Sequence, residues 1–160
     1  MARRRGKKAE EAVATGPPRV LVVNDEPDAC ELLNRILLAA GYQVARAHDT
    51  LQMTAALTDR PHAVILDVSA GGIGGNLKLL DTIRGQQDPA LAATRVVLCA
   101  TNASNAMFSW QAGIDAFVLR PFHADELLAE LAQVLARGDD DRPMARRRAL
   151  DAAKTGSPRP

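Results

Sequence analysis

Five short runs of apolar residues recur along the chain, and a helix-like segment follows each of them. The runs occupy residues 19–23, 42–47, 63–68, 94–100 and 116–119. The run at 19–23 is typical of a strand that is buried on both faces, and we expect the other four runs to be strands as well. Because parallel strands are joined by helical crossovers, the alternation predicts an α/β protein with a doubly wound, five-stranded parallel sheet.

The segments between the runs carry helical patterns. We expect helices over residues 29–40, 49–58, 104–112 and 124–136 and around 77–83. The helix over 124–136 has the strongest pattern, a single apolar stripe made of Leu127, Leu128, Leu131, Val134 and Leu135. The helix over 104–112 has a weaker pattern, and we expect its Trp110 to be partly exposed.

The length of 160 residues allows one domain with a buried core. No apolar run approaches the roughly 18 residues that a membrane span needs. Residues 1–8 are basic and have no apolar stretch behind them, so we expect no signal peptide. Cys30 and Cys99 lie in apolar segments and are too few for a disulfide framework or a zinc site. We therefore expect a cytoplasmic protein without a membrane segment.

Basic residues gather at the two ends of the chain. Residues 1–19 carry six basic and two acidic side chains and residues 137–160 carry seven and four, whereas residues 20–136 carry seven basic and thirteen acidic ones. We expect an acidic domain between two flexible basic tails, through which alone nucleic acid could be bound. Residues 145–154 favour a short helix without an apolar face wide enough to dock firmly.

Polar residues stand where the predicted strands end. In an open parallel sheet the working site lies beyond the carboxyl ends of the strands. The chain places acids, a hydroxyl and a cation at these ends, namely Asn24-Asp25-Glu26, Asp67, Thr101 and Arg120.

This combination of groups suits phosphoryl transfer. If Asp25, Glu26 and Asp67 converge, their carboxylates repel one another, and a hard cation such as Mg²⁺ relieves the repulsion. With the metal bound, Asp67 can act as a nucleophile toward a phosphoryl group. Thr101 can donate a hydrogen bond to one phosphoryl oxygen, and Arg120 can neutralise another. The pattern favours in-line transfer of a phosphoryl group onto an aspartate.

The chain resembles the receiver domain of two-component response regulators over about residues 18–136. The resemblance rests on the order and spacing of four fragments, which are Val22–Pro27, Val64–Asp67, Val97–Thr101 and Phe117–Phe122. It implies a flavodoxin-like (βα)5 fold for residues 19–136. The remaining segments, 1–18 and 137–160, are then the basic tails.

The resemblance also implies roles for residues at the strand ends. Asp67 would be the phosphoacceptor. Asp25, Asp67 and the backbone carbonyl of Ser69 would be the Mg²⁺ ligands, with Asn24 and Glu26 supporting the metal from outside its ligand set.

Three further roles follow from the same resemblance. Thr101 and Phe117 would be the switch pair, in which the hydroxyl turns toward the phosphoryl group and the aromatic ring fills the vacated space. Arg120 would supply the cation, and the peptide bond before Pro121 would be cis.

Partners follow from the resemblance as well. The phosphoryl donor would be a histidine kinase or a histidine phosphotransfer protein. A downstream protein would bind the face formed by residues 104–112, 116–119 and 124–136. Such a protein is not an enzyme beyond its own phosphorylation and dephosphorylation. Because only 24 residues follow residue 136, we expect a stand-alone receiver.

Several positions depart from the family pattern. Asn24 stands where the family has an acid, Arg120 where it has lysine, and Asn102 where it favours a small residue. Arginine is longer, planar and forked, so Arg120 could pair bidentately with Asp67 and block it. The loop over 69–75 lacks the usual proline and is rich in glycine. The alternative function is therefore a pseudo-receiver, a binding module that works without phosphorylation.

Overall fold

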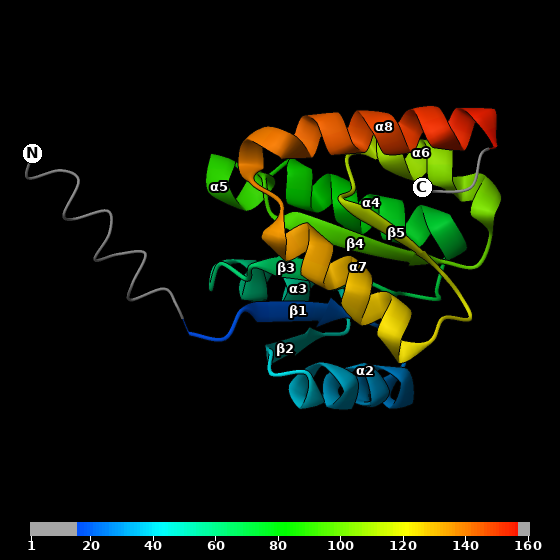
Figure 1. Ribbon diagram of the computed structural model, residues 1–160. Coiled ribbons are helices and arrows are strands. Elements are labelled where there is room, and N and C mark those ends of the chain that lie inside the picture. Colours follow the sequence, from blue (N-terminus) through cyan, green and yellow to red (C-terminus); the bar gives the residue numbers. More distant parts are fainter. Residues whose placement is uncertain (1–15, 157–160) are drawn as a thin grey trace, which may run out of the picture.

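The computed structural model describes residues 16–156 and contains one five-stranded parallel sheet (Figure 1). The strands are β1 (Arg19–Val23), β2 (Gln43–Ala47), β3 (Ala63–Leu66), β4 (Arg95–Ala100) and β5 (Ala116–Leu119). Their order in the sheet is β2-β1-β3-β4-β5, and every neighbouring pair is parallel. The predicted fold class is confirmed.

Helices cover both faces of the sheet. They are α2 (Pro27–Ala39), α3 (Thr50–Leu57), α4 (Gly72–Arg84), α5 (Pro89–Ala92), α6 (Ala106–Ala112), α7 (Ala124–Ala136) and α8 (Arg142–Thr155), with 3-10 turns at Ala103–Asn105 and Asp139–Asp141. Helices α2 and α7 pack on one face, and α3, α4 and α6 pack on the other. No helix within residues 16–156 has the length and apolar character to cross a membrane.

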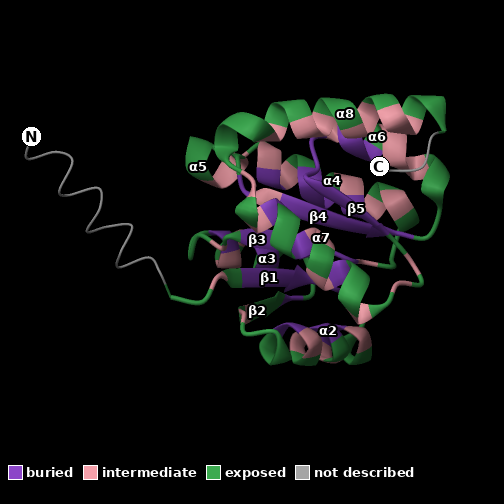
Figure 2. Cartoon of the chain, viewed as in Figure 1, coloured by how far each residue is buried: buried purple, intermediate pink, exposed green. Residues whose placement is uncertain are grey.

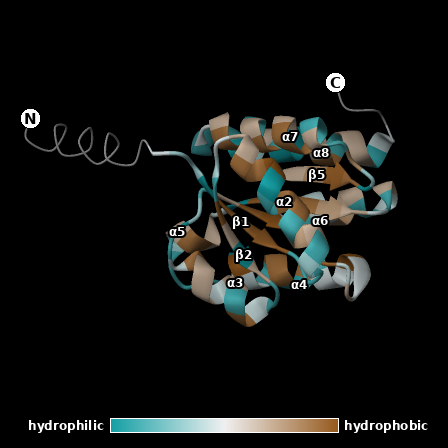
Figure 3. Ribbon diagram, turned by 90° about the horizontal axis from the view of Figure 1, so that it is seen from below, coloured by the Kyte–Doolittle hydropathy of each residue, from teal (hydrophilic) through white to brown (hydrophobic). Residues whose placement is uncertain are grey.

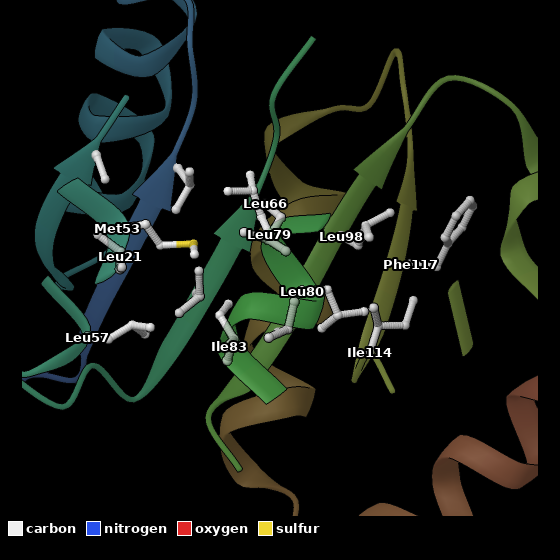
Figure 4. Close-up of a cluster of buried hydrophobic side chains, with 14 of the residues drawn as sticks. Leu21, Met53, Leu57, Leu66, Leu79, Leu80, Ile83, Leu98, Ile114 and Phe117 are labelled. Atoms are coloured by element: carbon white, nitrogen blue, oxygen red, sulfur yellow. The ribbon is translucent and has the colours of Figure 1, made fainter. Parts of the chain in front are cut away.

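Successive side chains of each strand point to opposite faces of the sheet, and this divides the core into two clusters. Val20 and Val22 of β1 face α2 and α7, whereas Leu21 and Val23 face the opposite cluster. Strands β1, β3, β4 and β5 are mostly buried, whereas the edge strand β2 and the outer helix surfaces are largely exposed (Figure 2). Apolar residues likewise gather on the inner parts of the fold (Figure 3). Figure 4 shows the larger cluster, in which side chains from β1, β3, β4, β5, α3 and α4 meet.

The strand register determines which residues leave the sheet together. Val23 of β1 is aligned with Leu66 of β3, so Asn24 and Asp67 follow the strands at the same level. The amide N–H of Asp67 donates to the Val23 carbonyl at 2.9 Å, which continues this alignment. The polar residues at the ends of the central strands are therefore neighbours in space.

The C-terminal segment differs from the expectation of a flexible tail over 137–160. Arg142–Thr155 forms helix α8, which packs along α6 (Figure 1). Its apolar contacts with the core are made by Ala149, Leu150 and Ala153. Two of these three residues are alanines, so they give only a weak signal in a hydropathy pattern. The short helix predicted over 145–154 is present and longer, but the prediction that its apolar face is too narrow to dock firmly is wrong.

Two smaller differences concern α5 and α6. The chain between α4 and β4 forms the short helix α5, in which the Asp88 side chain accepts from the Ala90 N–H at 2.9 Å. Trp110 of α6, which we expected to be partly exposed, is 6% exposed because it belongs to the core cluster. Cys30 and Cys99 are buried free thiols.

Candidate functional site

Asp67 follows β3 directly and is 3% exposed. Its Oδ1 accepts a hydrogen bond from Nη2 of Arg120, and the same nitrogen donates to the Asp67 carbonyl at 2.9 Å. Its Oδ2 accepts from Nδ2 of Asn24 at 3.1 Å. The predicted pairing of Arg120 with Asp67 is present, but one nitrogen makes both contacts instead of a fork on the two carboxylate oxygens.

Asn24 links the ends of β1 and β3. It is 1% exposed, and its Oδ1 accepts from the Glu26 N–H at 2.8 Å while its amide holds Asp67. Its carbonyl lies 3.0 Å from Nδ1 of His48. A neutral amide in this place can donate to the Asp67 carboxylate, which a second carboxylate could not do.

The Asp25 carboxylate is bound by the loop after β3. Its Oδ1 accepts from the N–H and hydroxyl of Ser69 at 2.9 and 3.1 Å, and its Oδ2 accepts from the Ala70 N–H at 2.8 Å. Burial raises the pKa of Asp25, but these hydrogen bonds outweigh it, so the pKa lies below its ordinary value of 3.8. Glu26 joins the same group by accepting from the Ser69 hydroxyl at 3.0 Å. Asp25 and Glu26 thus meet at Ser69, but the Asp67 carboxylate is bound by Arg120 and Asn24 instead, so the predicted convergence of all three acids is wrong.

The loop between β3 and α4 depends on glycine at two positions. Gly71 has φ of +78°, a left-handed conformation that residues with a side chain rarely adopt. A Cβ on Gly75 would collide with the Ala70 carbonyl oxygen. These glycines let the loop fold back tightly enough to present the Ser69 and Ala70 amides to Asp25.

Asn76 is a buried site residue that the sequence analysis missed. It is 3% exposed, and its side chain accepts from the Val68 N–H at 3.0 Å and donates to the Val68 and Cys99 carbonyls, both at 3.2 Å. It ties the residue after Asp67 to the end of β4. The available signal was an amide at a position from which Leu79, Leu80 and Ile83 continue a buried helical stripe.

Thr101 and Arg120 line a pocket beside Asp67. The pocket is also lined by Ser69, Ile73 and Asn76. Thr101 is exposed and follows β4 directly, and Asp67 itself is not among the residues that line the pocket.

Asn102 and Phe117 are the two remaining positions that the sequence analysis singled out. Asn102 is exposed, and its side chain accepts from the Ser104 N–H at 2.9 Å, capping the following turn. Phe117 is buried in the cluster that contains Trp110. The Arg120–Pro121 peptide bond is cis, as the resemblance implies.

The site contains oxygen donors of the type that bind a metal ion. Asp25 and Asp67 supply carboxylates and Ser69 a backbone carbonyl, a donor set that suits Mg²⁺, which uses one or two carboxylates and keeps several waters. Within residues 16–156 no group of three or more His, Cys, Asp or Glu side chains could hold a metal ion. Each Asp67 and Asp25 oxygen already accepts a hydrogen bond, but a carboxylate offers about four lone-pair sites, so the donors fit the ion.

Comparison with known proteins agrees with this fold. Residues 20–132 match the family model of the response regulator receiver domain. Response regulator MprA of Mycobacterium tuberculosis (strain ATCC 25618 / H37Rv) is 34% identical over 122 residues, which cover 74% of this chain and 51% of MprA. The chain spans about half the length of the curated relatives it matches.

Two solved structures extend the comparison. A putative response regulator from Chloroflexus aurantiacus is 27% identical, with a TM-score of 0.67 over 76% of this chain and 99% of its own. Response regulator protein TrrA of Thermotoga maritima, in complex with Mg²⁺ and BeF, is 27% identical, with a TM-score of 0.62 over 73% of this chain and 98% of its own.

A parallel sheet in this order, with a buried aspartate after its central strand, is what the receiver fold has. The chain belongs to the family of two-component response regulator receiver domains. This is not a catalytic enzyme family.

Proposed function

We propose that the chain accepts a phosphoryl group on Asp67 from a histidine kinase or a histidine phosphotransfer protein and so acts as a signalling receiver in the cytoplasm. The observation that carries the proposal is the arrangement around Asp67. A buried carboxylate stands at the carboxyl end of β3, with the Arg120 guanidinium on one oxygen and a pocket lined by Thr101 beside it.

In the proposed reaction, a carboxylate oxygen of Asp67 attacks phosphorus, the P–N bond of the phosphohistidine breaks, and the imidazole leaves as a neutral group. Arg120 neutralises charge on the phosphoryl oxygens, and Thr101 donates a hydrogen bond to one of them. Asn24 holds the second carboxylate oxygen in place. Asp25, Asp67 and the Ser69 carbonyl would hold Mg²⁺, which supplies positive charge to the transferred group when bound.

The readout of phosphorylation would be the Thr101 and Phe117 pair. In this proposal the hydroxyl turns toward the phosphoryl group and Phe117 repacks, which changes the face formed by α6, β5 and α7. A downstream protein would recognise that face.

The test is the intact mass after incubation with Mg²⁺ and acetyl phosphate. We expect an adduct of one phosphoryl group on the wild type and none on Asp67→Ala. Arg120→Lys and Asn24→Asp are informative companions because they restore the residues that the family has at these positions. An adduct on these variants together with none on the wild type would contradict phosphorylation of the native chain.

A second candidate is a binding module that works without phosphorylation. It is favoured by the Asp67 carboxylate, whose two oxygens are already bound by Arg120 and Asn24. In that case partner binding would be the same in the wild type and in Asp67→Ala.

Binding of nucleic acid by the basic ends of the chain is a form of this second candidate that has less support. Arg142 and Arg146 are engaged by Asp115, and residues 1–15 lie outside the described part of the chain. A gel shift at low salt tests that version.

A further inference from the structure

A buried carboxylate anchors the first half of α8. Asp115 stands immediately before β5, and its side chain is 3% exposed. Arg142 of α8 donates from Nε to Oδ1 at 2.9 Å and from Nη2 to Oδ2 at 3.1 Å, the forked geometry of a strong arginine–carboxylate pair. Arg146, one turn later, donates to Oδ1 at 3.3 Å and to the Ile114 carbonyl at 3.0 Å.

The second half of α8 packs on an apolar surface. Ala149, Leu150 and Ala153 pack against the core cluster that contains Trp110 of α6 and Phe117 of β5. The same alanines, Trp110 and Phe117 also line a groove along this contact.

Helix α8 depends on this surface for its own order. None of its residues is fully buried, and its N-terminus has no side-chain cap. A helix of 14 residues is marginal in water by itself, so docking is what keeps it folded. A helix held mainly by one face can leave that face without unfolding the sheet.

We propose that α6 and β5 form a helix-binding surface, that α8 occupies it in cis, and that a partner helix of the same chemistry displaces α8. Such a helix has two arginines four residues apart, which reach Asp115, followed by a stripe of alanines, which lies on Trp110 and Phe117. The proposal goes beyond phosphorylation and does not depend on it.

The first experiment compares two double variants of the full chain by hydrogen exchange. Arg142→Gln with Arg146→Gln removes the anchor of α8. Arg147→Gln with Arg148→Gln makes the same charge change at exposed positions of the same helix. Trp110, the single tryptophan of the chain, reports on the covered surface through quenching by acrylamide.

We expect the anchor variant to lose amide protection over residues 142–155 and to gain Trp110 quenching by at least about twofold, while β1 stays protected. The control variant should match the wild type. Ala149→Glu, which leaves both arginines in place, should act like the anchor variant. Equal protection of α8 in all four proteins would overturn the proposal, as would equal loss in the control.

The second experiment tests the surface in trans. The probe is a labelled synthetic peptide with the sequence of residues 142–155, titrated into the wild type and into the anchor variant and followed by fluorescence anisotropy. We expect binding to the anchor variant at least tenfold tighter than to the wild type, where α8 competes. A peptide with glutamine at both arginine positions should bind neither. Equal affinity for both proteins, or binding to neither, would show that the surface does not select such helices.

Discussion

Asp115 and Arg120 stand at the two ends of β5, immediately before and immediately after the strand, and each is paired with a charged group of another element. Asp115 binds Arg142 of α8, and Arg120 binds Asp67 after β3. Phe117 lies between them, in the cluster against which α8 packs. A strand of four residues therefore joins the anchor of α8 to the candidate phosphorylation site.

The shared strand predicts that a change at Arg120 reaches α8. Arg120→Gln removes the charged contact to Asp67, so the end of β5 is held less firmly and Phe117 supports α8 less well. We expect Trp110 quenching by acrylamide to rise, corresponding to a shift of about 0.5–2 kcal/mol in α8 docking. Arg35→Gln, an equal charge change at an exposed position of α2, is the control. Identical quenching in both variants would show that β5 does not transmit the change.

Asp115 and Arg142 should show strong energetic coupling. Removing one partner of a buried charged pair costs about 3–5 kcal/mol, so we expect Asp115→Asn to lower the free energy of unfolding by about that amount. In an Arg142→Gln background the same change should cost about 1–3 kcal/mol less. Urea unfolding of the four proteins measures the cycle. A cycle with Arg147→Gln, which changes an exposed position, should be additive.

Asn76 should contribute to stability through its three hydrogen bonds to backbone groups. Asn76→Leu restores an apolar helix stripe but leaves groups of Val68 and Cys99 without this partner. We expect the free energy of unfolding to fall by about 2–4 kcal/mol. Asn34→Leu, at a half-buried position of α2, should change it by less than about 0.5 kcal/mol. Equal stability of Asn76→Leu and the wild type would mean that the amide is dispensable.

The Asp25 carboxylate should account for part of the loss of folding stability at low pH. Its pKa is lowered in the folded chain, so its ionised form stabilises the fold above the ordinary value of 3.8, and this contribution is lost as the pH falls through the lower folded value. Asp25→Asn should therefore destabilise the chain at pH 7 and do so much less near pH 3. Denaturant midpoints at the two pH values measure the difference, with exposed Asp151→Asn as control. A pH-independent effect of Asp25→Asn would exclude this account.

The thiols should be unreactive in the folded chain. Burial raises the pKa of Cys99 from 9.0 to about 12, and it raises the pKa of Cys30 as well. Because the thiolate is the nucleophile, three pKa units correspond to about a thousandfold less reactive Cys99 at pH 8. Labelling with a disulfide reagent should be slow in buffer and fast for both thiols in urea. Rapid labelling of either thiol in buffer would contradict this expectation.

Much of the fold could be predicted from local patterns. The apolar runs and the helical stripes have periods that are visible within a few residues, and together they predict the parallel sheet and the helices that cover it. The polar residues at strand ends could also be predicted as one group, because parallel strands present their carboxyl ends at one edge. Asp67 and Arg120 meet there as expected.

Other features were decided by tertiary structure alone. Asp25 faces the amides of Ser69 and Ala70, a contact that needs the tight glycine loop and spans more than forty positions of the sequence. A local pattern contains no information about which distant amide a carboxylate will meet.

Helix α8 shows the same limit most clearly. From the sequence, residues 137–160 indicated a basic tail with a short helix over 145–154 that would not dock firmly, because arginine and alanine give no strong hydropathy signal. The fold supplies the partner for Arg142, since Asp115 lies 27 positions earlier in a buried place before β5. The sequence by itself determined the sheet and the edge where the chemistry lies. Only the tertiary structure decided that the basic segment is a docked helix. The buried Asp115 carboxylate and the apolar surface on which α8 packs exist only after the sheet has formed.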